Sequence, residues 1–169
     1  TFNDFNPNTF TILHINMRRL VHKMHLFKIL LAQLDVKFSC IVISETWLSN
    51  SEYYEKYFLD GHYLFCSSRP NGGGGGNCTY VSDEYEASVA GVWLTGAEAM
   101  VVRINSSVQP VYSVSAVYRT PSGVPSAFLA ELDAFLPSLP SNSIVVGDLN
   151  FDLNPNNETD DPTLVYMKK

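Results

Sequence analysis

The stretch that decides the fold reads FTILHINMRRLVHKMHLFKILLAQLDVKFSCIVISE and covers residues 10–45. Residues 10–15 alternate and are rich in β-branched side chains, which predicts a strand. Apolar residues then recur every three or four positions over residues 17–34, as on an amphipathic helix that ends near Asp35. Cys40–Ser44 is a continuous apolar run, typical of a strand covered on both faces. Together they predict a βαβ unit whose two strands lie in the same sheet.

The second half of the chain predicts hairpins and then another strand, helix and strand. The candidate strands at residues 62–66, 78–81, 99–104 and 111–118 are short and separated by turn-forming residues, which implies antiparallel hairpins. A helical pattern begins at Pro125 and is closed by Pro137. A buried strand follows at residues 143–147, and the Asn- and Asp-rich residues 154–161 predict a loop. The whole pattern indicates a single α/β domain.

Composition limits the classes of protein to which the chain can belong. Its 169 residues are 46% apolar, enough for one domain with a real core, and no run of 18 apolar residues would span a membrane. The formal net charge is −6, so the basic footprint of many nucleic-acid-binding domains is absent. DNA is not excluded, because a metal ion can hold phosphates in place of Lys and Arg. The three cysteines are an odd number without a C-x-x-C pair, so we expect neither a disulfide framework nor structural zinc. A reducing compartment is therefore expected for the protein.

Polar side chains stand at the ends of four predicted strands. Asn16 follows the first strand, Glu45 the second, Tyr118 ends a hairpin strand, and Asp148 and Asn150 follow the last. Strand ends of an α/β sheet share one rim, so we expect these five side chains to gather around a common cavity. Oxygen ligands without sulfur or imidazole suit a hard cation such as Mg²⁺. A cation beside an Asp that activates water is an arrangement for phosphodiester hydrolysis.

Each of these residues also has a simpler interpretation when it is taken alone. Glu45 is placed where a chain commonly reaches solvent, and residues 147–150 are typical of a turn. Tyr118 fits a half-buried aromatic residue, and Asn16 fits a helix cap. Their shared position after four separate strands favours the common site.

Four phrases of the sequence resemble a known family. INMR at 15–18, SETWL at 44–48, VYRTP at 117–121 and GDLNFDL at 147–153 look like the endonuclease/exonuclease/phosphatase superfamily. More narrowly, they resemble the apurinic-endonuclease-like domain that non-LTR (LINE-type) retrotransposons encode beside their reverse transcriptase. The resemblance covers nearly the whole chain in the right order.

The resemblance implies a four-layer α/β sandwich, in which two packed sheets lie between helices. Asn16 and Glu45 would form the metal site for Mg²⁺, with Mn²⁺ as the alternative ion and Glu45 as the principal ligand. The partner would be DNA, the isolated domain would be a monomer normally fused to a reverse transcriptase, and its action would place it in the nucleus.

The resemblance also implies roles in the reaction. Tyr118 would lie against the scissile phosphate, with Arg119 beside it as a weaker candidate. Asp148 would orient or deprotonate the attacking water, and Asn150 would hold the nucleophile and the phosphate. These groups would be fixed in advance where charge develops on the leaving oxygen.

The chain departs from the family in one respect. The family's pattern closes on a Ser-Asp-His phrase, which does not occur here, and His14, His22, His25 and His62 all precede Asp148. We therefore expect a domain that lacks its C-terminal part, with one sheet left short and with feeble or no activity, because loss of such a group costs about 10²- to 10³-fold in rate. Two alternatives stay open: a phosphatase or phosphodiesterase of the same superfamily, and a non-catalytic relic or interaction fragment.

Overall fold

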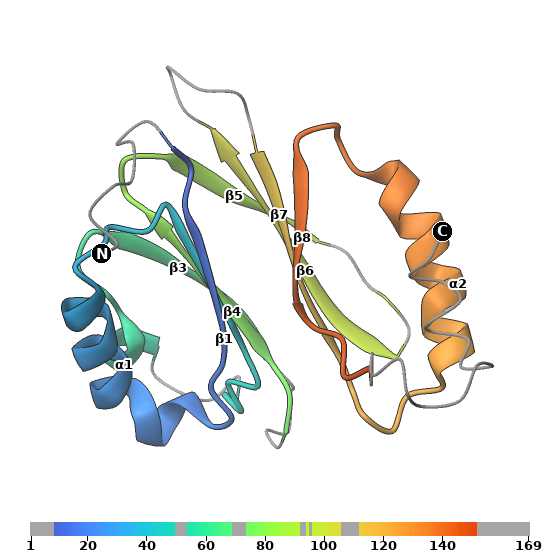
Figure 1. Ribbon diagram of the computed structural model, residues 1–169, viewed down its shortest axis with the longest axis horizontal. Helices are drawn as coiled ribbons and strands as arrows, with labels where there is room; N and C mark the ends of the chain where they lie inside the picture. The colour runs from blue at the N-terminus through green and yellow to red at the C-terminus, as the bar shows by residue number, and fades with distance from the viewer. Residues whose placement is uncertain are drawn as a thin grey trace.

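Two four-stranded sheets pack face to face, with helix α1 on the outer face of one and helix α2 on the outer face of the other (Figure 1). This computed structural model describes residues 9–49, 54–68, 74–91, 94, 96–105 and 112–151. The layers run helix, sheet, sheet, helix, so the α/β sandwich expected from the sequence is confirmed. The elements are β1 (Ile12–Asn16), α1 (Leu20–Leu34), β2 (Cys40–Ser44), η2 (Tyr54–Tyr57), β3 (His62–Ser67), β4 (Asn77–Ser82), β5 (Glu86–Gly91), β6 (Ala97–Asn105), β7 (Tyr112–Arg119), α2 (Pro125–Phe135), η3 (Leu136–Ser138) and β8 (Ser143–Asp148).

The first sheet has the strand order β1-β2-β4-β3. Strands β1 and β2 are parallel, as the βαβ pattern predicts, and α1 connects them. Strand β4 then pairs antiparallel with both β2 and β3. The register places Asn16 opposite Ser44, and Ser44 opposite Asn77, so these three residues form one row across the sheet.

The second sheet has the order β5-β6-β7-β8. Strands β5, β6 and β7 form an antiparallel meander, and β8 returns parallel to β7 after α2. The register places Glu98 opposite Tyr118, and Tyr118 opposite Asp148. These three residues form a second row, at the matching end of the second sheet.

Three apolar layers hold the sandwich together. One lies between α1 and the first sheet, one between the two sheets, and one between the second sheet and α2. Phe27 and Phe128 anchor the two outer layers, and each is 1% exposed. In the middle layer Cys40 is fully buried, and burial raises the pKa of its thiol to about 12, so it stays neutral.

The predicted elements are all present where the structure describes them, with differences of a few residues at their ends. The first helix begins at Leu20 and not at residue 17, because Arg18 and Arg19 adopt left-handed backbone conformations (φ 39° and 81°). Strand β5 was not predicted, since its sequence EASVAG has few bulky apolar side chains and it is defined by its pairing with β6. Residues 154–161, expected to form a loop, lie outside the described residues.

The cysteines correct one expectation from the sequence. Cys66 and Cys78 are joined by a disulfide, with their Cα atoms 4.2 Å apart, whereas the sequence led us to expect no disulfide framework. The two residues lie directly opposite each other on the antiparallel strands β3 and β4. Only the hairpin register brings them together, and that register is not visible in the cysteine spacing.

Within the described part of the chain, neither helix has the length and apolar character needed to cross a bilayer.

Candidate active site

Six polar residues from six strands form two facing rows at one end of the sandwich. Val42 and Val81 of the first sheet, and Met100, Ala116 and Val146 of the second, pack into the layer between the sheets. Because side chains alternate along a strand, residues two or four positions before or after these apolar residues face the same layer. We call this set the polar rim: Asn16, Ser44 and Asn77 in the first sheet, and Asp148, Tyr118 and Glu98 in the second.

Asn16 joins the two sheets at one end of the polar rim. Its side-chain nitrogen donates to Glu45 Oε1 at 2.9 Å and to Asp148 Oδ2 at 2.6 Å. Its side-chain oxygen accepts the backbone N–H of Arg18 at 3.1 Å, which fixes the orientation of the amide. Two carboxylates that are 103 positions apart in the sequence therefore converge on one nitrogen atom.

Glu45 is held in this position by an unusual backbone. Both Glu45 and Trp47 are left-handed, with φ values of 55° and 56°, which is uncommon for residues other than glycine. The N-terminal end of α1 holds the segment from one side, since the N–H groups of Arg19 and Leu20 donate to the carbonyl oxygens of Glu45 (2.7 Å) and Thr46 (3.0 Å). The turn is thus built to direct the Glu45 carboxylate toward Asn16 and Asp148.

The converging oxygens fit a hard divalent cation. Glu45 and Asp148 supply carboxylate oxygens, which suit Mg²⁺ or Mn²⁺, and Asn16 would add its amide oxygen if the amide turned from the bonds that its nitrogen makes to them. The described residues contain no group of three or more His, Cys, Asp and Glu side chains placed to hold a metal. A cation held by one or two carboxylates keeps most of its coordination for water and phosphate, which is the usual mode for Mg²⁺.

Asp148 and Asn150 form a tight turn after β8. The backbone N–H of Asn150 donates to Asp148 Oδ1 at 3.0 Å, and Asn150 is left-handed with φ 49°. The side-chain nitrogen of Asn150 donates to the carbonyl oxygen of Arg119 at 2.7 Å. In this arrangement Asn150 braces the Asp148 turn against β7.

Arg119 is placed differently from what the resemblance implies. The side chain is 3% exposed, and its nitrogens donate to the carbonyl oxygens of Leu149 (2.7 Å), Asn150, Thr120 (3.2 Å) and Gly123 (2.9 Å). Its guanidinium also lies 4.3 Å from the centroid of the Phe151 ring. With its donors directed at backbone carbonyls, Arg119 is placed to hold the loop after β8 and not to contact a phosphate.

Tyr118 lies in the middle of its row, between Glu98 and Asp148, and is 5% exposed. Its position agrees with the sequence-based expectation that it accompanies Asp148.

Beneath the polar rim, His14 Nε2 lies 3.0 Å from the hydroxyl oxygen of Ser44. Burial lowers the pKa of His14, against a smaller opposing effect of the Asp148 carboxylate, so its ring is neutral at pH 7.

The sequence reasoning missed half of the polar rim. Ser44, Asn77 and Glu98 were not singled out, because Ser44 was taken only as the end of a strand and as part of the SETWL phrase, and Asn77 and Glu98 stand at the beginning of strands without a recognisable motif. The sequence does contain one signal for Glu98. It alternates with Met100 and Val102, so a carboxylate occupies a core-facing position of the strand, which is typical of a residue with a specific role.

Gly147 allows β8 to lie close to β7 immediately before Asp148. Its φ is +155°, and a Cβ atom built there would lie 1.8 Å from the carbonyl oxygen of Val117, its partner in the register. We therefore expect Gly147→Ala to destabilise the fold by more than about 3 kcal/mol, since the contact is with backbone that cannot move without breaking the sheet. Urea unfolding followed by circular dichroism measures the effect.

Gly96→Ala is the matched control for this prediction. Gly96 also has a positive φ of 81°, but a Cβ atom there would have no neighbour within 4 Å. Its substitution should cost only about 1 kcal/mol from backbone strain. Equal losses for the two variants would contradict the close approach of β8 to β7.

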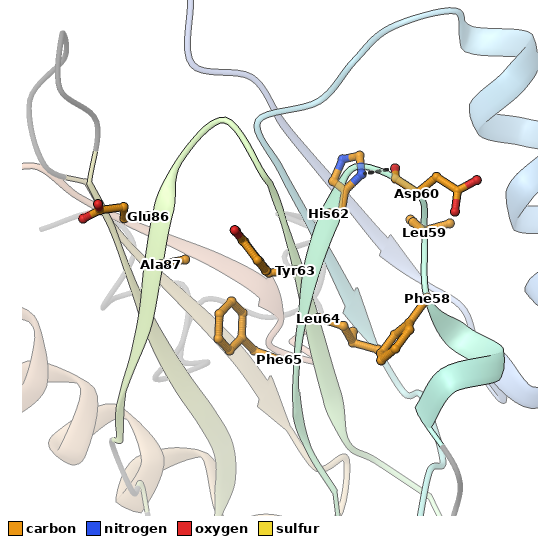
Figure 2. A pocket seen from close by; sticks show the side chains of 9 residues that line it. All are labelled: Phe58, Leu59, Asp60, His62, Tyr63, Leu64, Phe65, Glu86 and Ala87. Atoms are coloured by element: carbon orange, nitrogen blue, oxygen red, sulfur yellow. Dashed lines mark hydrogen bonds between the residues drawn. The ribbon is translucent and has the colours of Figure 1, made fainter.

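A separate cavity of about 740 Å³ lies between the edge strands β3 and β5. Figure 2 shows the side chains of Tyr63 and Phe65 lying in this space, opposite Ala87 of β5. Glu86 and Ala87 lie at the end of β5 that pairs with the C-terminal end of β6, whereas Glu98 lies near the N-terminal end of β6. The cavity is therefore away from the polar rim and offers positions for control substitutions.

Comparisons with known proteins identify the family of the chain. A model of the endonuclease/exonuclease/phosphatase family matches residues 13–165, and the chain belongs to that family. No curated protein sequence matches the chain.

Similar solved structures share the fold at low sequence identity. They include the endonuclease domain of TRAS1, a telomere-specific non-LTR retrotransposon (16% identity, TM-score 0.58, 85% of this chain and 61% of that one). They also include an AP endonuclease from Archaeoglobus fulgidus, with 17% identity and a TM-score of 0.65 over 87% of this chain and 60% of that one. The 3′ phosphatase NExo from Neisseria, bound to a product DNA hairpin, has 16% identity and a TM-score of 0.64 over 85% of this chain and 58% of that one. The chain spans about 60% of the length of these structures.

Proposed function

We propose that this chain is the Mg²⁺-dependent DNA endonuclease domain of a retrotransposon polyprotein, which nicks DNA to expose a 3′-hydroxyl for reverse transcription. The observation that carries the proposal is the convergence of Glu45 and Asp148, one from each sheet, on the side chain of Asn16. The family of the chain, the phrases SETWL and VYRTP, and the fold shared with the TRAS1 endonuclease domain support the choice of DNA as substrate.

The proposed reaction is hydrolysis of a phosphodiester by water. Glu45, with Asn16, would hold a Mg²⁺ ion, which when bound would supply positive charge beside the phosphate and its leaving oxygen. Asp148 orients the attacking water and takes its proton, and the N–H of Asn150 at 3.0 Å keeps the carboxylate in place. Tyr118, which is opposite Asp148 in the register, would donate its hydroxyl to a phosphate oxygen.

A second candidate function is phosphatase activity within the same family. One of the similar structures is described as a 3′ phosphatase, and removal of a terminal phosphate uses the same kinds of group. A non-catalytic fragment that keeps the fold is the remaining alternative. The three candidate functions differ in the bond that is broken. The endonuclease breaks a phosphodiester bond, the phosphatase breaks the bond to a terminal phosphate, and the non-catalytic fragment breaks none.

A plasmid-nicking assay run beside phosphate-release assays separates these functions. We expect the chain in Mg²⁺, at enzyme excess and over long incubations, to convert supercoiled plasmid to the open circle, with no phosphate released from an inositol phosphate. Chelation of the metal should stop the conversion. Phosphate release without nicking would favour the phosphatase, and no turnover with either substrate would favour the non-catalytic reading.

A further inference from the structure

Glu98 is, with Asp148, one of the two carboxylates of the polar rim, and the proposed reaction gives it no role. It stands at the second position of β6, opposite Tyr118, with its side chain partly buried. A charged side chain that faces the layer between two sheets is costly unless its oxygens are satisfied. The partners of Glu98 therefore indicate what it does.

Glu98 links the second sheet to the turn that begins β4. Its Oε2 atom accepts the backbone N–H of Gly76. Its backbone oxygen accepts the side-chain nitrogen of Asn77 at 2.9 Å, and Asn77 is fully buried. Both contacts cross from one sheet to the other, at the opposite end of the polar rim from the contact between Asn16 and Asp148.

The Gly75–Gly76 turn, which is bonded to Glu98, also holds the segment that carries Glu45. The carbonyl oxygen of Gly76 accepts the N–H of Thr46 at 3.1 Å, and that of Gly75 accepts the N–H of Trp47 at 2.9 Å. These two bonds are the counterpart of the bonds from the end of α1 on the other side. The left-handed Glu45 segment is therefore held by backbone hydrogen bonds from α1 on one side and from the Gly75–Gly76 turn on the other.

The turn lies so close to Thr46 that only glycine fits at position 76. Gly76 has a φ of +82°, and a Cβ atom there would lie 2.6 Å from the side-chain oxygen of Thr46. A displacement of Gly76 acts on Thr46 through the hydrogen bond between their backbones, and from there on the adjacent Glu45. The bond from Gly76 to Glu98 is the part of this chain of contacts that a side-chain substitution can remove.

We propose that Glu98 is a positioning residue for the metal site: its carboxylate fixes the Gly75–Gly76 turn, and the turn fixes the backbone of Glu45. The inference rests on the proposed function, since it concerns the same site. Glu98 acts through an accepted hydrogen bond and not through its charge on the cation. An oxygen at the same position, charged or not, should therefore be sufficient.

Two substitutions separate an accepted hydrogen bond from a charge. Glu98→Ala removes the acceptor and should weaken Mg²⁺ binding about 10-fold or more, as loss of an outer-shell partner commonly does. Glu98→Gln keeps an oxygen that can accept the Gly76 N–H, so its Mg²⁺ affinity should stay within about 3-fold of the original chain. Isothermal titration calorimetry with Mg²⁺ alone measures both. Glu86→Ala, an exposed carboxylate on β5, is the control and should change nothing.

Hydrogen exchange tests the same contact without metal or substrate. The amides of Thr46 and Trp47 should exchange at least about 10-fold faster in Glu98→Ala than in the original chain, because the turn that accepts them is released. Peptides from β2 and β7 should exchange as before, which shows that the variant is folded. If Glu98→Ala does not fold, Glu98→Thr takes its place, because threonine suits a strand and is too short to reach Gly76.

The outcomes distinguish this inference from the proposed function. Unchanged exchange at Thr46 and Trp47 would overturn the positioning role, and so would a Glu98→Gln variant that binds Mg²⁺ as weakly as Glu98→Ala. Failure of the original chain to bind Mg²⁺ would instead overturn the metal-dependent function. In that case the exchange measurement would still decide whether Glu98 holds the Glu45 segment.

Discussion

Asp148→Asn is expected to slow plasmid nicking by about 10²- to 10⁴-fold, the usual contribution of a general base. An amide has the shape of the carboxylate, and its oxygen can accept the N–H of Asn150, but it cannot take a proton from water. The loss should therefore appear in the rate at saturating DNA and leave DNA affinity nearly unchanged. Single-turnover nicking and a DNA-binding titration measure the two quantities separately.

Asp133→Asn is the control for this prediction. Asp133 is an exposed carboxylate on α2, on the outer face of the second sheet, so its substitution removes the same charge away from the polar rim. Its nicking rate should equal that of the original chain. If Asp148→Asn nicks DNA as fast as Asp133→Asn, Asp148 has no part in the reaction.

Glu45→Gln is expected to weaken Mg²⁺ binding by more than about 100-fold. Outer-shell partners commonly contribute about 10- to 100-fold to metal affinity, and a direct ligand contributes more. The substitution leaves an oxygen near Asn16 but removes one of the two negative charges that converge there. Calorimetric titration with Mg²⁺ should show binding in the original chain and none in the variant at the same concentrations.

Glu55→Gln provides the matched control, because Glu55 is an exposed carboxylate on η2. It should bind Mg²⁺ like the original chain. Equal binding by all three proteins would remove Glu45 from the metal site, whatever the nicking assay shows.

The sequence predicted most of the fold because its signals are local. Three- and four-residue periodicity defines α1 and α2, and short apolar runs define β2 and β8. Strand β5 was missed because EASVAG has little intrinsic strand character and gains its conformation from pairing with β6. The start of α1 at Leu20 was missed because the left-handed residues before it have no sequence signature.

The candidate site was predicted in part for a related reason. Residues that end parallel strands share a rim, so Asn16, Glu45 and Asp148 were expected together, and hydrogen bonds now link them. The placement of Arg119, the pairing of Cys66 with Cys78 and the contacts of Glu98 all depend on register between strands, which a single sequence does not display.

The most direct test of the metal site is anomalous diffraction from crystals of the chain soaked in Mn²⁺. The proposal predicts one anomalous peak within coordinating distance of the carboxylate oxygens of Glu45, on the side facing Asp148, where the two sheets meet at Asn16. A peak held elsewhere, or crystals in which Mn²⁺ binds nowhere near Glu45 and Asp148, would contradict it.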